Sequence, residues 1–475
     1  MLPYFDLLKN TGITIGFFRI TWHTQSFNRT VVKWSTKLPY LYRSSFKLGV
    51  YISLLLFPIA MTFVVLSIFT SNSTSVSVTS DGTAQPASTS SDVARLQILL
   101  PGVNLPINEF GYYVIALLIC SVVHELGHGI AAVLEDIPVT GFGLNLVFLI
   151  PIAYTEIDTD QITSARLWKK LKVYSAGIWN NIILAAFAYA FLLLTPILLS
   201  PIYLTNESVV ITSIKYKSPL SGKENGLHVG DVISSINDCS VKNEEDWYKC
   251  LTETIVYHPA YCIKEEFVHE NDESIQISHQ KDGLIDCCQK NPALNCFENY
   301  INNHFDEEDR LPQHMCLNIR NTVENSLGYC HVGDKKCTAS SCLKPILSNF
   351  STIIQMKRQV NTKDLIYFGH PADVSKTVKI SGFVPKTKVL RSSKIGDSIT
   401  LLLKYLVVFS SGLAIVNVIP CYFLDGQFLI NALIIALPAR YFNKTKKEFI
   451  SFSINLLGTI FLFASIFKIL WTTFK

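Results

Sequence analysis

Charged residues are scarce in this chain of 475 residues. Only 16% of the residues are charged, 49% are hydrophobic, and the formal net charge is +4. So small a net charge does not favour nucleic acid as a partner. The positive mean hydropathy is instead typical of a multispanning membrane protein that carries a soluble portion.

Two further features are missing. Residues 1–45 have no compact apolar core beside a small-residue cleavage site, so we expect no cleavable signal peptide. Aromatic and basic residues mix in this N-terminal segment, which favours a position at the membrane interface or an ordinary amphipathic packing role. No internal repeat is visible, although transporters usually show repeated halves.

No Cys-x-x-Cys pair occurs among the twelve cysteines. Cys120 and Cys421 lie in apolar stretches, and the other ten lie in one polar block, residues 205–395. An even set in one soluble block predicts disulfides and a lumenal or exterior location, with a cysteine metal site as the alternative. The glycosylation sequons at Asn206 and Asn349 agree with a lumenal side.

Apolar segments divide the remaining sequence. We expect a span at 46–70, a flexible Ser/Thr-rich linker at 71–95, and a membrane core over 108–204. Within this core, residues 141–157 are short and interrupted by glycine and proline, which predicts a re-entrant or hairpin-like segment. A second part of the membrane core covers 398–475, with apolar segments at 398–419, 422–440 and 449–473.

Basic residues orient these spans. The polar link after residue 157 carries Arg166, Lys169, Lys170 and Lys172, which predicts a cytosolic side. The next span, 173–204, would then cross to the lumen, where the cysteines require the block 205–395 to lie. The beginning of that block predicts strands at 209–214 and 231–236 and a helix at 243–251, a small mixed α/β unit.

The sequence His124-Glu125-Leu126-Gly127-His128 lies inside the apolar stretch 111–134. A helix of this length spans roughly 36 Å and crosses a bilayer. Residues four apart share one helix face, so both imidazoles can bind one ion, and His-Glu-x-x-His is a zinc-site signature. Glu125 points beside the metal, where it can act as a general base and later as a general acid. The alternative is a pair of core histidines with backbone partners, which leaves the buried carboxylate unexplained.

A hydrolytic zinc site usually has three protein ligands and one position for water. Between Ser398 and Lys447, Asp425 is the only acidic residue, in the sequence Asn417-Val-Ile-Pro-Cys-Tyr-Phe-Leu-Asp-Gly426. Its proline interrupts the helix, which membranes tolerate only against protein or a water-filled cavity. Asp425 is therefore the expected third ligand, with a helix cap as the alternative.

These two motifs together resemble the site-2 protease family of intramembrane zinc metalloproteases. Residues 175–180 resemble a family motif in the span after the catalytic helix. The Ser-rich tract, the cysteine-rich insert and the Leu227-x-x-Gly230-Asp231 turn resemble the family's animal members. The resemblance implies one Zn²⁺ ion per chain, held by His124, His128 and Asp425, with Glu125 as catalytic base. The implied fold is a polytopic α-helical membrane protein with a lumenal, cysteine-rich, mixed α/β insert that contains a PDZ-like fold.

The expected activity is cleavage of a peptide bond within a substrate's transmembrane segment. The resemblance implies substrates that are membrane-tethered transcription factors, such as sterol regulatory element-binding proteins, cut first by another protease. It also implies a Golgi or endoplasmic reticulum membrane. Asn180 and Asn417 are amides in apolar spans, and either binds substrate backbone or the oxyanion, or forms helix–helix hydrogen bonds. The alternatives for the whole chain are a prenyl-protein endopeptidase, a zinc or proton transporter, and a docking protein without catalysis.

Overall fold

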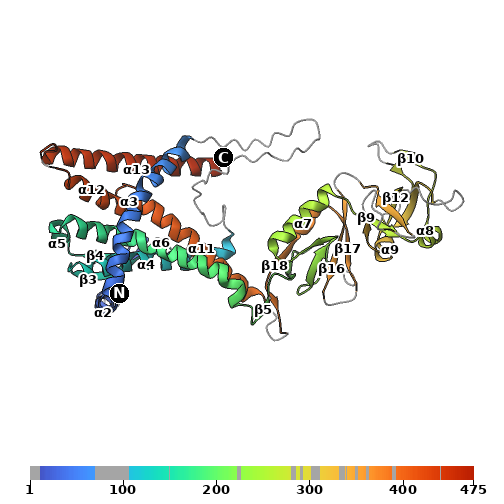
Figure 1. Cartoon of the computed structure of the whole chain (residues 1–475), viewed down its shortest axis with the longest axis horizontal. Helices are drawn as coiled ribbons and strands as arrows, with labels where there is room; N and C mark the ends of the chain where they lie inside the picture. The colour runs from blue at the N-terminus through green and yellow to red at the C-terminus, as the bar shows by residue number, and fades with distance from the viewer. Residues whose placement is uncertain are drawn as a thin grey trace. The chain divides into compact units, whose positions relative to one another are not determined.

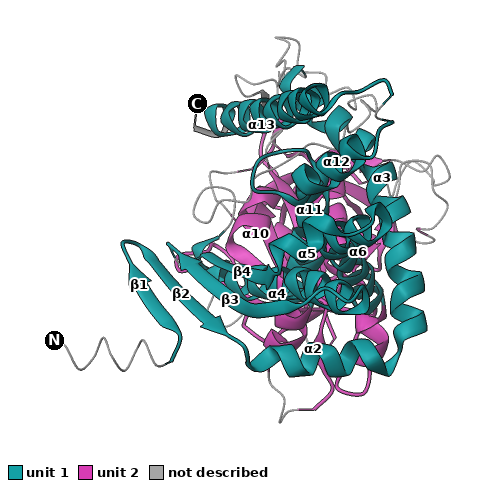
Figure 2. Cartoon of the chain, turned by 90° about the vertical axis from the view of Figure 1, so that its left-hand side faces the viewer, with its two compact units in different colours: residues 1–193, 400–475 teal, residues 194–399 magenta. Residues whose placement is uncertain are grey.

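The computed structural model describes residues 11–69, 106–148, 150–221, 226–279, 285–288, 293–300, 311–330, 337, 340–347, 351–359, 363–387, 392–438 and 440–474. The linker predicted at 71–95 lies outside the described residues. The chain forms two compact units (Figure 2). We call residues 1–193 and 400–475 the membrane unit, and residues 194–399 the cysteine-rich unit.

Among the described residues, five helices are long and apolar enough to cross a bilayer (Figure 1). They are α3 (Pro39–Phe69), α4 (Phe110–Leu134), α6 (Leu167–Leu198), α11 (Lys394–Val418) and α13 (Lys444–Phe474). The predicted polytopic helical architecture is therefore confirmed. The apolar segment at 422–440 forms only a short helix, α12 (Asp425–Ile435), because the preceding Pro420 cannot donate a helical hydrogen bond.

A four-stranded antiparallel sheet lies beside these helices in the membrane unit (Figure 2). Its order follows the chain: β1 (Ile13–Gly16), β2 (Arg19–Thr24), β3 (Val139–Val147) and β4 (Ile150–Ile157). The segment 141–157 thus forms a hairpin, which α5 (Thr159–Ser164) follows. The N-terminal hairpin β1–β2 was not predicted. Helix α2 (Ser26–Lys37) buries Val31 and Ser35 and packs against α4.

The cysteine-rich unit contains a six-stranded sheet with the path β17-β16-β7-β6-β18, and β8 pairs with β7. Its core surrounds the fully buried Trp247 of α7 (Glu244–Val256). The elements of this sheet are β6 (Val209–Ile214), β7 (Val232–Ile236), β8 (Cys239–Ser240), β16 (Thr352–Arg358), β17 (Leu365–Gly369), α10 (Pro371–Thr377) and β18 (Val378–Ser381). The strand prediction at 209–214 agrees with β6 at both ends, the prediction at 231–236 agrees with β7 within one residue, and α7 extends five residues beyond the predicted end at 251.

A second sheet, of five strands in the order β13-β12-β15-β9-β14, follows in the same unit. Its elements are β9 (Ala260–Ile263), β12 (Leu294–Tyr300), β13 (His314–Asn318), β14 (Tyr329–Cys330) and β15 (Ser341–Pro345), with α8 (Glu265–Asn271) and α9 (Ile319–Glu324). Two short pairs complete the unit: β5 (Tyr203–Leu204) with β19 (Val384–Pro385), and β10 (Ser278–His279) with β11 (Ile285–Asp286).

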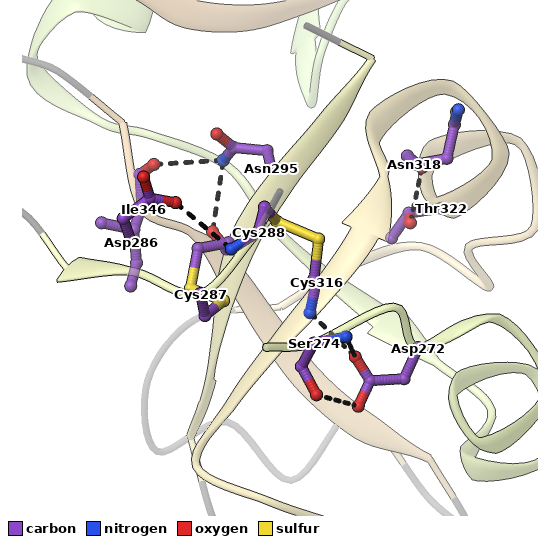
Figure 3. The surroundings of a disulfide bond; sticks show 11 residues. Asp272, Ser274, Asp286, Cys287, Cys288, Asn295, Cys316, Asn318, Thr322 and Ile346 are labelled. Atoms are coloured by element: carbon purple, nitrogen blue, oxygen red, sulfur yellow. Dashed lines mark hydrogen bonds between the residues drawn. A yellow bond between two sulfur atoms is a disulfide. The ribbon is translucent and has the colours of Figure 1, made fainter. Parts of the chain in front are cut away.

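All ten cysteines of this unit form disulfides, which confirms the prediction from their number and placement. The pairs are Cys239–Cys250, Cys262–Cys337, Cys287–Cys296, Cys288–Cys316 and Cys330–Cys342. Cys120 and Cys421 are free and buried in the membrane unit. Figure 3 shows the Cys288–Cys316 bridge, where the Asp272 carboxylate accepts hydrogen bonds from the backbone N–H groups of Cys316 and Ser274.

Candidate metal centre

The two histidines of the sequence motif lie on the buried side of α4, and their Nε2 atoms point toward each other. Their Nε2 atoms lie 3.2 Å apart, and the exposed fractions of His124 and His128 are 7% and 8%. The spacing of four residues places both rings on one face of the helix. Glu125 follows His124, and one ligand atom from each of the three side chains lies within 4.8 Å of the others.

Asp425 reaches the same point from the other end of the sequence. Its Oδ2 lies 3.0 Å from His124 Nε2 and 3.2 Å from His128 Nε2. Asp425 is the first residue of α12, directly after the break at Pro420. Because a Cβ on Gly426 would lie 2.2 Å from the carbonyl oxygen of Ile419, only glycine fits the tight turn that places this carboxylate.

The donor atoms fit a zinc ion. Two imidazole nitrogens and one carboxylate oxygen are common zinc ligands, and tetrahedral bonds of 2.0–2.1 Å separate such donors by about 3.3 Å. The observed separations of 3.0–3.2 Å are close to that value. Gly177 of α6 leaves room for the two histidine donor atoms, since a Cβ there would lie 2.4 Å from His128 Nε2 and 2.6 Å from His124 Nε2.

The outward ring nitrogens of both histidines also have neighbours on α6. The Nδ1 of His128 lies 2.8 Å from the carbonyl oxygen of Val173, and the Nδ1 of His124 lies 3.1 Å from the side-chain amide of Asn181. A carbonyl accepts a hydrogen bond from Nδ1–H, which keeps the proton on Nδ1 and leaves the Nε2 lone pair free to bind a metal. The arrangement around His128 is therefore that of a metal-binding imidazole.

Strand β4 packs against the same helix, next to Glu125. Thr155 Oγ1 donates a hydrogen bond of 2.9 Å to the carbonyl oxygen of Glu125, and the backbone N–H of Ala153 donates to Ser121 Oγ at 2.7 Å. Because β4 pairs with β3 on its other side, these bonds show that its open edge faces α4. The sheet edge and the candidate base are therefore neighbours.

Helix α13 packs against the non-helical segment between α11 and α12, which precedes Asp425. The backbone N–H of Tyr422 donates to Thr459 Oγ1 at 3.2 Å, and a Cβ on Gly458 would lie 2.2 Å from the carbonyl oxygen of Pro420. Nearby, Asn455 Nδ2 donates to Asn431 Oδ1 of α12 at 2.9 Å. A helix without these small and polar residues could not approach the break so closely.

The two amides that the sequence singled out, Asn180 and Asn417, have different surroundings in the structure. Asn180 Nδ2 donates to the carbonyl oxygen of Val123 at 3.3 Å, a contact between α6 and α4. Within the described residues we find no hydrogen bond of the Asn417 side chain. The amide of α6 that contacts a candidate ligand is Asn181, which the sequence patterns did not single out. Its position four residues after Gly177, on the same face of α6, was the available signal.

Comparisons with known proteins give a consistent result. Residues 112–463, well over half of the chain, match the model of peptidase family M50. The chain is also similar to a protein of Arabidopsis thaliana described as a membrane-bound transcription factor site-2 protease homolog, with 31% identity over 147 residues. That match covers 31% of this chain and only 28% of the relative's own length.

Proposed function

This chain belongs to peptidase family M50, and we propose that it is an intramembrane metalloendopeptidase that hydrolyses a peptide bond within the transmembrane segment of another protein. One observation carries the proposal. Three donor atoms from α4 and α12, almost 300 residues apart in sequence, converge inside apolar helices with Glu125 beside them. Ionisable groups at membrane depth are costly and mark function more often than accident.

We propose that His124, His128 and Asp425 hold one Zn²⁺ ion, which would supply Lewis-acid chemistry at the scissile carbonyl. Glu125 then accepts a proton from the attacking water and returns it to the leaving nitrogen. Of the two predicted amides, Asn417 is the better candidate for binding substrate backbone, because Asn180 is engaged with Val123.

The substrate is proposed to unwind and add as a strand to the sheet. The sequence segment 141–154, short and interrupted by glycine and proline, suggests an edge for such a strand. Its first part lies in β3, which pairs with β2 and β4 on its two sides, so only its second part, in β4, keeps an unpaired edge. The open edge is β4. A substrate strand there would replace the contact between Ala153 and Ser121 and lie next to Glu125.

A proline at Ala153 tests this edge, because it removes the outward N–H. We expect Ala153→Pro to abolish cleavage, whereas Ser121→Ala, which removes only the contact that the substrate displaces, keeps cleavage. Normal turnover by the proline variant would rule out strand addition at this position.

The cysteine-rich unit is proposed to lie in the lumen of the Golgi or endoplasmic reticulum. Its first sheet with α7 and α10 is proposed to be the PDZ-like element, which would exclude substrates whose ectodomain has not been shortened. The proposed substrates are single-pass or hairpin membrane proteins of the kind that tether transcription factors, such as sterol regulatory element-binding proteins.

Cleavage of a membrane-anchored reporter tests the activity. We expect Glu125→Gln to lose on the order of 10²–10⁴ in rate, the usual contribution of a general base. The matched control is Glu156→Gln, since Glu156 is an exposed carboxylate of β4 that pairs with His23. If Glu125→Gln cuts the reporter at the normal rate, the protease proposal fails.

A further inference from the structure

Asn181 is an amide buried completely inside an apolar helix. Its backbone carbonyl accepts a hydrogen bond from Ser410 Oγ of α11 at 3.0 Å, so its place between helices is fixed. Its side chain lies 3.1 Å from the Nδ1 of His124. A buried polar side chain in a membrane span needs a reason, and the ring nitrogen beside it supplies one.

That ring nitrogen decides whether His124 can bind a metal. A neutral imidazole carries one proton, so Nε2 has a free lone pair for a metal only when Nδ1 carries that proton, and a hydrogen-bond acceptor at Nδ1 favours this tautomer. His128 has such an acceptor in the carbonyl of Val173. For His124, the side-chain amide of Asn181 occupies the corresponding position.

The amide has an acceptor available for this purpose. Asn181 Oδ1 is buried and has no hydrogen-bond partner among the described residues, while Nδ2 faces the ring. The two ends of an amide have nearly the same shape, and the hydrogen-bond network determines which way it points. If the amide is turned by 180°, Oδ1 faces His124 and accepts a hydrogen bond from its Nδ1–H. Nδ2 then takes the position of Oδ1 and is the atom without a partner.

We infer that Asn181 is a positioning residue that holds His124 in the metal-binding tautomer through an Nδ1–H to Oδ1 hydrogen bond. The inference rests on the proposed metal site and deepens it. Outer partners of this kind orient a ligand ring and raise its basicity, and carboxylates serve as well as carbonyls. The two histidines thus receive equivalent support from one helix, by backbone at Val173 and by side chain at Asn181.

Zinc affinity of the full-length protein, measured by competition with a chromophoric chelator, tests the inference. We expect Asn181→Leu to weaken zinc binding 10–100-fold, the usual effect of losing an outer partner. Asn181→Asp keeps an acceptor and should retain zinc near the wild-type affinity. Asn180→Leu, on the adjacent residue, should leave zinc affinity unchanged.

A role in helix packing alone predicts the opposite order, because leucine is close to asparagine in size and a buried carboxylate is not tolerated. Wild-type zinc affinity in Asn181→Leu, or an equal loss in Asn181→Asp, would overturn the inference. If Asn181→Leu fails to fold, Asn181→Ala adds no bulk and carries the same expectation. A wild-type protein that binds no zinc would instead sink the proposed function, so the two failures are distinguishable.

Discussion

The two units of this protein are stabilised by different means. The cysteine-rich unit buries large apolar side chains such as Trp247 and Tyr261 and links ten cysteines in pairs. The membrane unit also buries apolar side chains, but its helices approach one another at glycines and at isolated polar contacts, because lipid removes the hydrophobic drive between helices. Substitutions in the first unit should therefore change stability, whereas those at the contacts of the second should change metal binding.

The largest expected effect is on the stability of the cysteine-rich unit. Cys262 and Cys337 are 75 residues apart, whereas Cys287 and Cys296 are nine apart. Removing the first pair by alanine substitution should lower the free energy of unfolding by about 4.5 kcal/mol, and removing the second by about 2.5 kcal/mol, from loop entropy alone. Chemical denaturation measures both values. Loss of zinc affinity in either variant would contradict the expectation that substitutions in this unit change stability and not metal binding.

The next effect concerns Gly177, which leaves room for both Nε2 atoms. We expect Gly177→Ala to lower zinc affinity on the order of 100-fold, because the added Cβ overlaps the donor atoms. Gly412→Ala in α11 is the matched control, since nothing lies within 4 Å of a Cβ there. Metal titration of both proteins compares them, and equal affinities would show that the donor atoms do not converge beside Gly177.

A smaller effect on zinc affinity is expected at the contact between α13 and the segment before Asp425. Thr459→Val removes the acceptor for the Tyr422 N–H, and a lost buried hydrogen bond costs about 1–3 kcal/mol. We expect zinc affinity to fall roughly tenfold if about 1.4 kcal/mol of this reaches Asp425. Thr459→Ser keeps the hydroxyl and should restore the affinity. Unchanged affinity in Thr459→Val would show that α13 does not position the third ligand.

The smallest effect is a pH dependence in the cysteine-rich unit. Burial, together with the nearby Lys344 ammonium, lowers the pKa of His258 below its ordinary value of 6.5. The unfolded chain then binds this proton more readily than the folded one, so stability is complete above pH 6.5 and falls as the pH drops toward the lowered pKa. His258→Gln should reduce this slope in thermal unfolding between neutral and mildly acidic pH. An identical slope in the variant would mean that groups other than His258 cause the pH dependence of stability.

The sequence predicted the features that local patterns determine. Hydropathy was sufficient for the helical architecture, cysteine number and placement for the disulfides, and motif spacing for the candidate ligands. The place of the N-terminal hairpin in the sheet could not be predicted in this way, because β2 pairs with β3 across more than 100 residues. The same pairing makes β3 an interior strand and leaves the unpaired edge beside α4 to β4.

Two other details depend on geometry that spacing does not fix. The sequence singled out Asn180, yet the phase of α6 turns its neighbour Asn181 toward His124. Ten cysteines in one block indicate disulfides but not their partners, because the partners depend on how the segments between the strands fold, and even the strand register does not fix them. Cys296 and Cys316, for example, face each other across β12 and β13, yet they bond to Cys287 and Cys288.

The central claim is that α4 and α12 together build one zinc site with a separate base. The most direct measurement is the zinc content per chain of purified wild-type protein, Glu125→Gln and Asp425→Asn, after dialysis against a weak chelator. We predict one zinc per chain in the wild type and in Glu125→Gln, and loss of zinc in Asp425→Asn. Full zinc content in Asp425→Asn, or none in the wild type, would contradict the account.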